Sequence, residues 1–441
     1  MEWKTIVTLK FYRLKSFGLI FSQLIMVLTF CTWVSAALAR EDYDLDDDGL
    51  VEIQSIDDIH RMLTKTNQLS RQPYPGCPNQ KCIGFELTQG LTFSTNAVTA
   101  SDLKKPVGYQ GLNAKKPKEA SPYVDANWPR IKRFKLIFEG NGHYLSNISL
   151  NEHSRAMFDT ATHAVFRNIT ISINPQSRRR SAVLVSNATD TEFNNITING
   201  GYALNGLLAM RVHNSKISHC VIKGEVKGTH GVGLLMGKAK KTIVSNCTIQ
   251  GKVAGSHDVG LIAGNSDSSE FHDLTVKGDI EGAFNTAGGV GEVVNSLFRN
   301  VTVQASVTGR QLSVGGLAGT LEGSDIRNSL FSGDIYAKSS KAGGIAGMII
   351  RSHLQENEVD AKIVAQKNVG LIAGSATNSS VQKFKFSGLA TLERRSNDDS
   401  EIKPIADWFA SHSETTISSV KYNPTLPKKT KTQPWYSSVF E

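Results

Sequence analysis

A six-residue pattern rich in glycine recurs along the middle of this 441-residue chain, and Val314-Gly315-Gly316-Leu317-Ala318-Gly319 is its clearest form. Nine copies begin at Ser154, Arg180, Asn205, Val232, Val259, Ala287, Val314, Ala342 and Val369. The starts lie 25–28 residues apart. A unit this short cannot bury its apolar face alone, so the fixed period predicts a solenoid of stacked coils.

Each copy is followed at a constant offset by a segment with apolar residues at alternate positions. One of these positions is apolar in all nine copies: Ile171, Ile198, Ile222, Ile249, Val276, Val303, Phe331, Val359 and Phe386. Alternation with a period of two and many β-branched residues favour short strands over helices. We therefore predict an all-β fold class, a single-stranded parallel β-helix (β-solenoid) of about nine 25–28-residue coils with N- and C-terminal caps.

Stacked strands about 4.8 Å apart would make nine coils a rod roughly 43 Å long. We expect the recurring glycines at the corners between strands, where φ is positive or where backbones crowd.

The first 39 residues have the features of a signal peptide. Four basic residues precede an apolar run from Phe17 to about Val34, and Ala37-Leu38-Ala39 offers a cleavage site of small residues. An uncleaved membrane anchor is the alternative, because the run is just long enough to span a bilayer. We expect cleavage, and therefore a secreted or cell-surface protein that is not integral to the membrane.

The rest of the chain divides into four parts. Residues 40–82 form an acidic leader that ends in a cysteine-containing loop, and residues 83–150 form an N-terminal cap with the first irregular coils. Residues 151–391 hold the repeats. Residues 392–441 form a C-terminal cap and a basic tail, in which aromatic residues are expected to cover the edge of the last coil.

The acidic leader has the spacing of an EF-hand-like calcium loop. Asp44, Asp46 and Asp48 occupy loop positions 1, 3 and 5, and Gly49 occupies position 6, where the turn is sharp. Hard oxygen donors at alternate positions can wrap one Ca²⁺ ion. The predicted metal ligands are Asp44, Asp46, Asp48, the carbonyl oxygen of Leu50, and Glu52.

The loop departs from this pattern at position 12, where Ser55 replaces the usual bidentate carboxylate. Asp57 or Asp58 could substitute for it. The alternative is a solvated acidic leader without a metal.

Four cysteines are candidates for disulfides, which export permits. Cys77 and Cys82 flank a turn with Pro and Asn and are predicted to close a small loop. Cys220 and Cys247 occupy the same inward position of adjacent coils, where Cα atoms about 5 Å apart are within the range of a disulfide. Two buried thiols are the equal alternative for this second pair.

Two polar columns also recur. The first is expected to stack amides from coil to coil at a turn and contains Asn168, Asn195, Asn246, Asn300 and Asn328. The second points outward and suits ion pairs on a solvated face, and it contains Glu225, Lys252, Asp279, Asp334 and Lys362. We interpret both columns as structural.

The x-Gly-Gly-Leu-x-Gly copies resemble the GLUG motif, which is found in tandem in exported bacterial surface proteins. The opening Asp44–Ile53 is similar to the DxDxDGLxEI segment of such proteins, and Cys82–Thr88 and Phe138–His143 are similar to their CxGYELT and FxGNGH segments. The resemblance implies an exported protein of the bacterial envelope. It implies no activity.

We favour a non-catalytic surface adhesion, binding or structural module, with surface glycans or another cell-surface protein as candidate partners. Basic clusters such as Lys238-Ala239-Lys240-Lys241 would suit anionic glycans. They lack aromatic neighbours, so nucleic acid is not expected. The alternative is a polysaccharide-active enzyme, a lyase or hydrolase on a pectate-lyase-like β-helix, although no His-Glu-x-x-His, Gly-x-Ser-x-Gly or Walker sequence is present.

Overall fold

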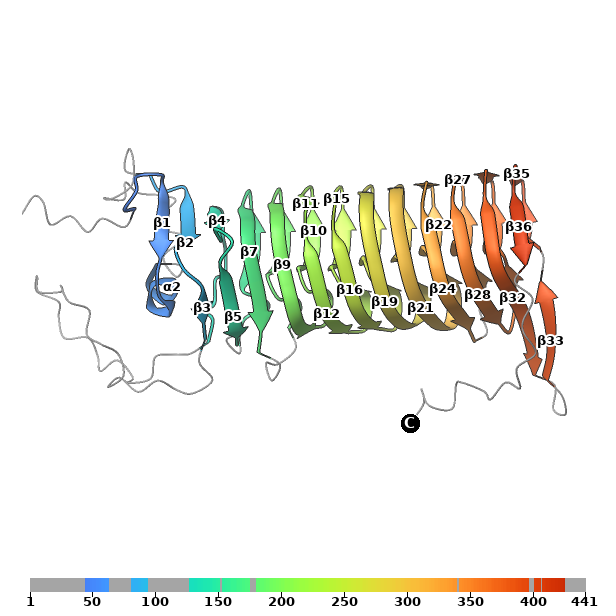
Figure 1. Ribbon diagram of the computed structural model, residues 1–441, viewed down its shortest axis with the longest axis horizontal. Helices are drawn as coiled ribbons and strands as arrows, with labels where there is room; N and C mark the ends of the chain where they lie inside the picture. Colours follow the sequence, from blue (N-terminus) through green and yellow to red (C-terminus); the bar gives the residue numbers. More distant parts are fainter. Residues whose placement is uncertain are drawn as a thin grey trace, which may run out of the picture.

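The computed structural model is a straight rod of stacked parallel coils (Figure 1), which confirms the predicted β-solenoid of about nine turns. It describes residues 44–62, 81–93, 127–150, 153–174, 180–338, 341–395, 400–405 and 407–424. The predicted signal peptide, residues 1–39, lies outside these ranges. None of the described helices is long and apolar enough to cross a membrane.

The coils share two long sheets, of which one begins at the first described coil and the other at Phe158. Ten strands form one sheet: β6 (Phe158–Thr162), β8 (Val185–Thr189), β10 (Ala209–His213), β14 (Met236–Lys240), β18 (Ala263–Asp267), β20 (Val290–Val294), β22 (Ala318–Glu322), β26 (Ala346–Ile350), β30 (Ala373–Thr377) and β34 (His412–Ser413). Neighbours in this sheet are successive coils, and every pairing is parallel.

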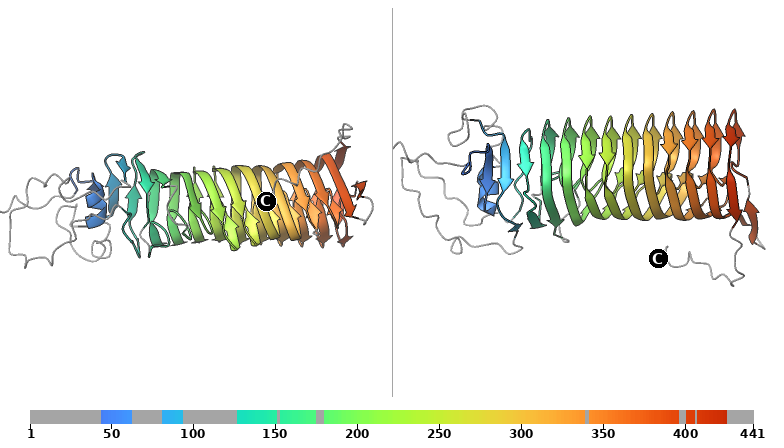
Figure 2. Two further views of the ribbon diagram at one scale, coloured as in Figure 1. Left: turned by 90° about the horizontal axis from the view of Figure 1, so that it is seen from below. Right: turned by 45° about the horizontal axis from the view of Figure 1, so that its top comes forward.

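The remaining strands belong to a 26-stranded sheet that wraps the other sides of the rod (Figure 2). Its repeat strands are β7 (Val165–Ile173), β9 (Glu192–Ala203), β11 (Lys216–Ser218), β12 (Val221–Lys227), β13 (His230–Gly233), β15 (Ile243–Ser245), β16 (Thr248–Ala254), β17 (His257–Gly260), β19 (Glu270–Ala287), β21 (Leu297–Gly315), β23 (Asp325–Arg327), β24 (Leu330–Ala337), β25 (Ala342–Gly343), β27 (His353–Gln355), β28 (Glu358–Ala365), β29 (Val369–Gly370), β31 (Ser380–Gln382) and β32 (Lys385–Arg395). Its terminal strands are β1 (Leu50–Ile53), β2 (Gly84–Leu87), β3 (Leu91–Thr92), β4 (Ile137–Glu139), β5 (Tyr144–Ile148), β33 (Ser400–Ile405), β35 (Thr416–Ser418) and β36 (Lys421–Pro424), and the helix α2 (Ile56–Met62) follows β1.

Equivalent residues of successive coils lie in register. Ile222 pairs with Ile249, which pairs with Val276, and the ladder continues through the predicted apolar column. These side chains are fully buried in one continuous core, where Phe166 stacks on Phe193 with ring centroids 5.4 Å apart. The apolar alternation in the sequence therefore predicted the inward face correctly.

Among the described residues, asparagine is the residue type found most often with a left-handed φ, ahead of glycine. The predicted amide column adopts left-handed φ values, such as 56° at Asn168 and 54° at Asn195. The amide of Asn195 donates to the side-chain oxygen of Asn168 at 2.9 Å, as expected for stacked amides. Asn is one of the few residues with a side chain that tolerates this conformation.

The recurring glycines mostly serve close packing between coils. Gly315 does not have a positive φ, but a Cβ atom there would lie 2.5 Å from the Cα of Ala346 in the next coil. A Cβ atom at Gly233 would likewise lie 2.6 Å from the Cα of Ala263 in the next coil. Our expectation of backbone crowding at these glycines is thus confirmed, and our alternative expectation of a positive φ at Gly233 and Gly315 was wrong.

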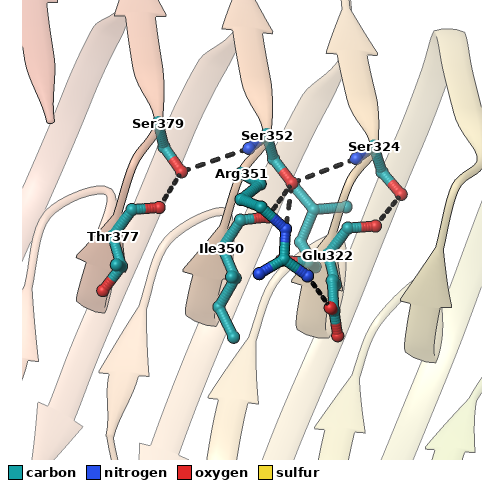
Figure 3. A network of polar contacts seen from close by, with 8 residues as sticks. Glu322, Ser324, Ile350, Arg351, Ser352, Thr377 and Ser379 are labelled. Carbon is teal, nitrogen blue, oxygen red and sulfur yellow. Dashed lines mark hydrogen bonds and ion pairs between the residues drawn. The ribbon is translucent and has the colours of Figure 1, made fainter. Parts of the chain in front are cut away.

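A buried ladder of hydroxyl groups, which the sequence analysis missed, follows one corner of the rod (Figure 3). Ser324 donates its backbone N–H to the Oγ of Ser352 at 3.1 Å, and Ser352 donates its own to the Oγ of Ser379 at 3.2 Å. Each hydroxyl in turn donates to the carbonyl oxygen two residues earlier. The same arrangement links Thr242, Ser269 and Ser296.

The solenoid extends beyond both predicted boundaries of the repeat region. In the leader, β1 pairs in parallel with β2, so residues 50–53 already belong to the first coil. After residue 391, β34, β35 and β36 pair in parallel with the preceding coil. Trp408 packs edge-on against Phe384 at 5.9 Å, which places one of the predicted aromatic cap residues on the last coil. The basic tail beyond residue 424 lies outside the described residues.

Candidate functional sites

The acidic loop forms a series of tight turns around the side chain of Asp44. Asp44 is fully buried, and its two carboxylate oxygens accept the backbone N–H groups of Asp48 at 3.1 Å and Gly49 at 2.8 Å. The side chain of Asp48 accepts the N–H of Leu50 at 2.6 Å. These turns, with φ of 91° at Gly49, gather the side-chain oxygens of Asp44, Asp46 and Asp48 within 4.8 Å of one another.

Glu52 points its carboxylate back to this loop from β1. Its side chain is 7% exposed, and Oε1 accepts the backbone N–H of Leu45 at 2.5 Å. Its other oxygen, Oε2, is buried and has no hydrogen-bond partner.

The structure adds one acidic residue that the sequence analysis missed. Glu86 of β2 lies opposite Glu52 in the parallel ladder and is 8% exposed. Its Oε2 accepts the amide of Asn141 at 2.6 Å. Carboxylate oxygens of Asp46, Glu52 and Glu86 lie within 4.8 Å of one another. Asp46 therefore joins two groups of acidic side chains, one on the loop and one across two coils.

Electrostatics in this cluster oppose ionisation. Burial raises the pKa of Asp44, Glu52 and Glu86, and neighbouring carboxylates raise each of them further. Asp57 and Asp58, the other candidate ligands, pair with Arg61 on α2. Asp58 also accepts the hydroxyl of Ser55 at 2.7 Å, as expected of a helix start rather than of a metal ligand.

The cysteines of the repeats are thiols. Cys247 Sγ accepts the backbone N–H of Cys220 at 3.3 Å, and both side chains are free and buried. Of our two alternatives for this pair, the structure has the thiols and not the disulfide. The contact with Cys247 and burial raise the pKa of the Cys220 thiol. Cys82 is buried, while Cys77 lies outside the described residues, so their pairing stays a prediction.

The predicted outward column is a solvated face. Glu225, Lys252 and Asp279 face one another in register, and Lys252 forms an exposed ion pair with Asp279 at 3.7 Å. Lys240 in the basic cluster forms another with Asp267 at 3.1 Å. Exposed pairs of this kind contribute little to stability.

A groove of about 730 Å³ crosses five successive coils on the side of the rod. It is lined by Ser146, Asn147, Ser172, Ile173, Asn199, Gly200, Gly201, Tyr202, Gly224, Glu225, Gly251 and Lys252. These residues come from β5, β7, β9, β12 and β16, which lie side by side (Figure 1). The groove therefore runs along the rod and not around it.

A one-residue bulge at Gly200 and Gly201 shapes this groove. The register of β9 and β12 shifts between Lys223 and Glu225, because Gly200 and Gly201 add one residue to β9. Both have positive φ, 75° and 120°, and no atom lies within 4 Å of where a Cβ of Gly200 would stand. The bulge leaves open space at Gly200, and Tyr202, two residues later, remains 38% exposed.

A second hollow of about 530 Å³ lies at a corner and includes His163, Asp190, Glu192 and Lys241. Asp190 is already engaged, because it accepts the amide of Asn214 and lies 3.4 Å from the His163 ring nitrogen. We interpret this hollow as a corner ladder.

No protein-family model matches the sequence, and no curated protein sequence matches it.

Proposed function

We propose that this protein is an exported β-solenoid that acts as a non-catalytic binding module, holding a surface glycan in the groove beside Tyr202. Membership of the GLUG-motif family and a place at the bacterial surface are part of this proposal and rest on the sequence resemblance.

The groove beside Tyr202 is the observation that carries the proposal. Sugars present hydroxyl groups around their rims and apolar C–H faces, so they bind where an aromatic ring stands among polar donors and acceptors. Tyr202 supplies the ring, Asn199 supplies an amide, and Glu225 supplies a carboxylate. Glu225 and Lys252 balance in charge, which favours an uncharged or weakly charged glycan.

Calcium at the N-terminal end is the second part of the proposal. The buried carboxylates of the acidic loop repel one another, and a divalent cation held by oxygen donors would relieve this repulsion. Ion binding there would stabilise the first coil and protect the open end of the sheet. In this proposal the loop stabilises the rod and takes no part in glycan binding.

A glycan array tests the binding function. The protein should bind a subset of glycans, and Tyr202→Ala should lose at least tenfold in affinity for them. Tyr144→Ala is the matched control, because Tyr144 is 50% exposed on β5 but does not line the groove. Equal binding by the wild type and Tyr202→Ala would refute the groove as the site.

The polysaccharide-active enzyme receives no specific support from this groove. Such chemistry needs two or three convergent carboxylates or a positioned base. Among the groove-lining residues that the structure describes, Glu225 is the only carboxylate.

A further inference from the structure

We propose that Glu86 of the second coil binds the same Ca²⁺ ion as the acidic loop of the first coil, so that the ion joins β1 to β2. This inference rests on the proposed calcium site and adds what the ion does there. It replaces the carboxylate missing at Ser55 with one that comes from another coil.

A ladder of three glutamates provides the first argument. Glu52 pairs with Glu86, and Glu86 pairs with Glu139, in three successive coils. Like charges stacked at this spacing destabilise a sheet unless they are neutralised. Glu139 is neutralised, since Arg167 of the next coil forms an ion pair with it.

Glu52 and Glu86 have no such partner. Neither carboxylate forms an ion pair among the described residues, although both are more than nine-tenths buried. Buried charges are as a rule paired or bound to a metal. Arg167 supplies a positive charge for Glu139, and no described residue supplies one for Glu52 and Glu86 at the N-terminal end of the ladder.

The unpartnered Oε2 of Glu52 provides the second argument. A buried polar atom without a partner is rare and calls for an explanation. This atom belongs to the residue whose carboxylate groups with those of Asp46 and Glu86 within 4.8 Å. Asp46 is exposed, and it also belongs to the second group of carboxylates, with Asp44 and Asp48. One cation beside Asp46 would serve both groups.

The donor set favours calcium. Every candidate ligand is an oxygen: five carboxylates, and the carbonyl of Leu50 that the loop spacing assigns. Calcium takes six to eight oxygens in flexible geometry, whereas Mg²⁺ demands a near-ideal octahedron and zinc prefers nitrogen and sulfur. Asn141 holds Glu86 through Oε2, which leaves Oε1 for the ion.

The consequence is a cation that acts across the first sheet pairing. Among the described strands, β1 pairs with β2 and with no other, through Leu50–Ile53 and Gly84–Leu87. A ligand from each strand makes ion binding and strand pairing mutually dependent. Removing calcium would leave two buried like charges opposite each other at the end of the rod.

Calorimetric titration of the full-length protein with CaCl₂ tests this inference. Glu86→Gln keeps the size of the side chain and an acceptor for Asn141, and it should weaken Ca²⁺ binding at least tenfold. Glu86→Asp keeps a carboxylate on a side chain that is one methylene shorter, and its affinity for Ca²⁺ should lie between those of the wild type and Glu86→Gln. Glu139→Gln is the matched control, because it alters the ladder position that already has Arg167, and it should bind like the wild type.

The outcomes separate this inference from the proposed site. If Asp46→Asn abolishes binding and Glu86→Gln binds like the wild type, the loop binds calcium alone and the role of Glu86 is refuted. If the wild type binds no calcium at millimolar concentration, both proposals fail. Circular dichroism of each variant shows whether it is folded, and MgCl₂ titrated in place of CaCl₂ should give at least tenfold weaker binding.

Discussion

Replacing Ser352 by alanine should destabilise the rod far more than the loss of one hydroxyl suggests. Ser352 is fully buried, and its Oγ is the acceptor for the backbone N–H of Ser324 at 3.1 Å (Figure 3). The same hydroxyl donates to the carbonyl of Ile350 at 2.7 Å. That carbonyl keeps a second partner, the N–H of Gly323 at 2.9 Å, whereas the N–H of Ser324 is left without one.

The magnitude follows from this asymmetry. An orphaned buried N–H costs about 1–3 kcal/mol, and the lost bond to Ile350 adds about 1 kcal/mol, so we expect a loss of about 3 kcal/mol. With an m-value of about 3 kcal/mol per molar urea, the unfolding midpoint should fall by about 1 M. Ser352→Cys should lose less, because a sulfur can accept in such a column, as Cys247 does from Cys220.

Urea unfolding followed by circular dichroism measures this loss. Ser380→Ala is the control, because its hydroxyl contacts His353 on the exposed face and should change stability by about 0.5 kcal/mol or less. If Ser352→Ala and Ser380→Ala unfold at the same urea concentration, the hydroxyl ladder does not stabilise the rod as we argue.

Three further substitutions test the fold by the same assay. Phe166→Ala should cost about 3–5 kcal/mol, because its ring is fully buried between Phe134, Phe158 and Phe193; a loss under about 1 kcal/mol would mean the core is not packed there. Gly315→Ala should cost about 1–3 kcal/mol or more, since its Cβ would meet a backbone oxygen at 2.1 Å, and a neutral result would contradict the close approach of the coils. Glu292→Gln should stabilise the protein at neutral pH, because burial raises the pKa of Glu292 and its folded state holds the proton more tightly than the unfolded chain; the gain should vanish below the ordinary glutamate pKa, and a gain that persists in acid would contradict this cause.

The sequence predicted the repeated part of the fold well, because the period of the repeat determines which residues of successive coils pair with one another. Every coil places an apolar residue at the same offset, and most coils also place a glycine and a corner residue such as asparagine at fixed offsets, so stacking follows once the period is known. The partners of Ile222 and of Asn168 could be read directly from that period. The role of the glycines was harder to predict, because a position that needs a positive φ and a position where two backbones approach closely both select glycine.

Glu86 was missed because it lies outside the regular period. It follows Glu52 by 34 residues (86 − 52), and the sequence between them has no repeat from which to count. The similarity of Leu50-Val51-Glu52-Ile53 to Gly84-Phe85-Glu86-Leu87 was the one available signal. The groove was missed for a related reason, since it depends on Gly200 and Gly201, where one extra residue in β9 breaks the repeat.

Hydrogen–deuterium exchange of the full-length protein, with and without calcium, tests the central claim most directly. If one ion joins the first two coils, calcium should slow exchange of the backbone amides of both β1 and β2. It should leave the amides of β21, far along the rod, unchanged (Figure 1). Protection confined to the acidic loop, or none in either strand, would contradict the account.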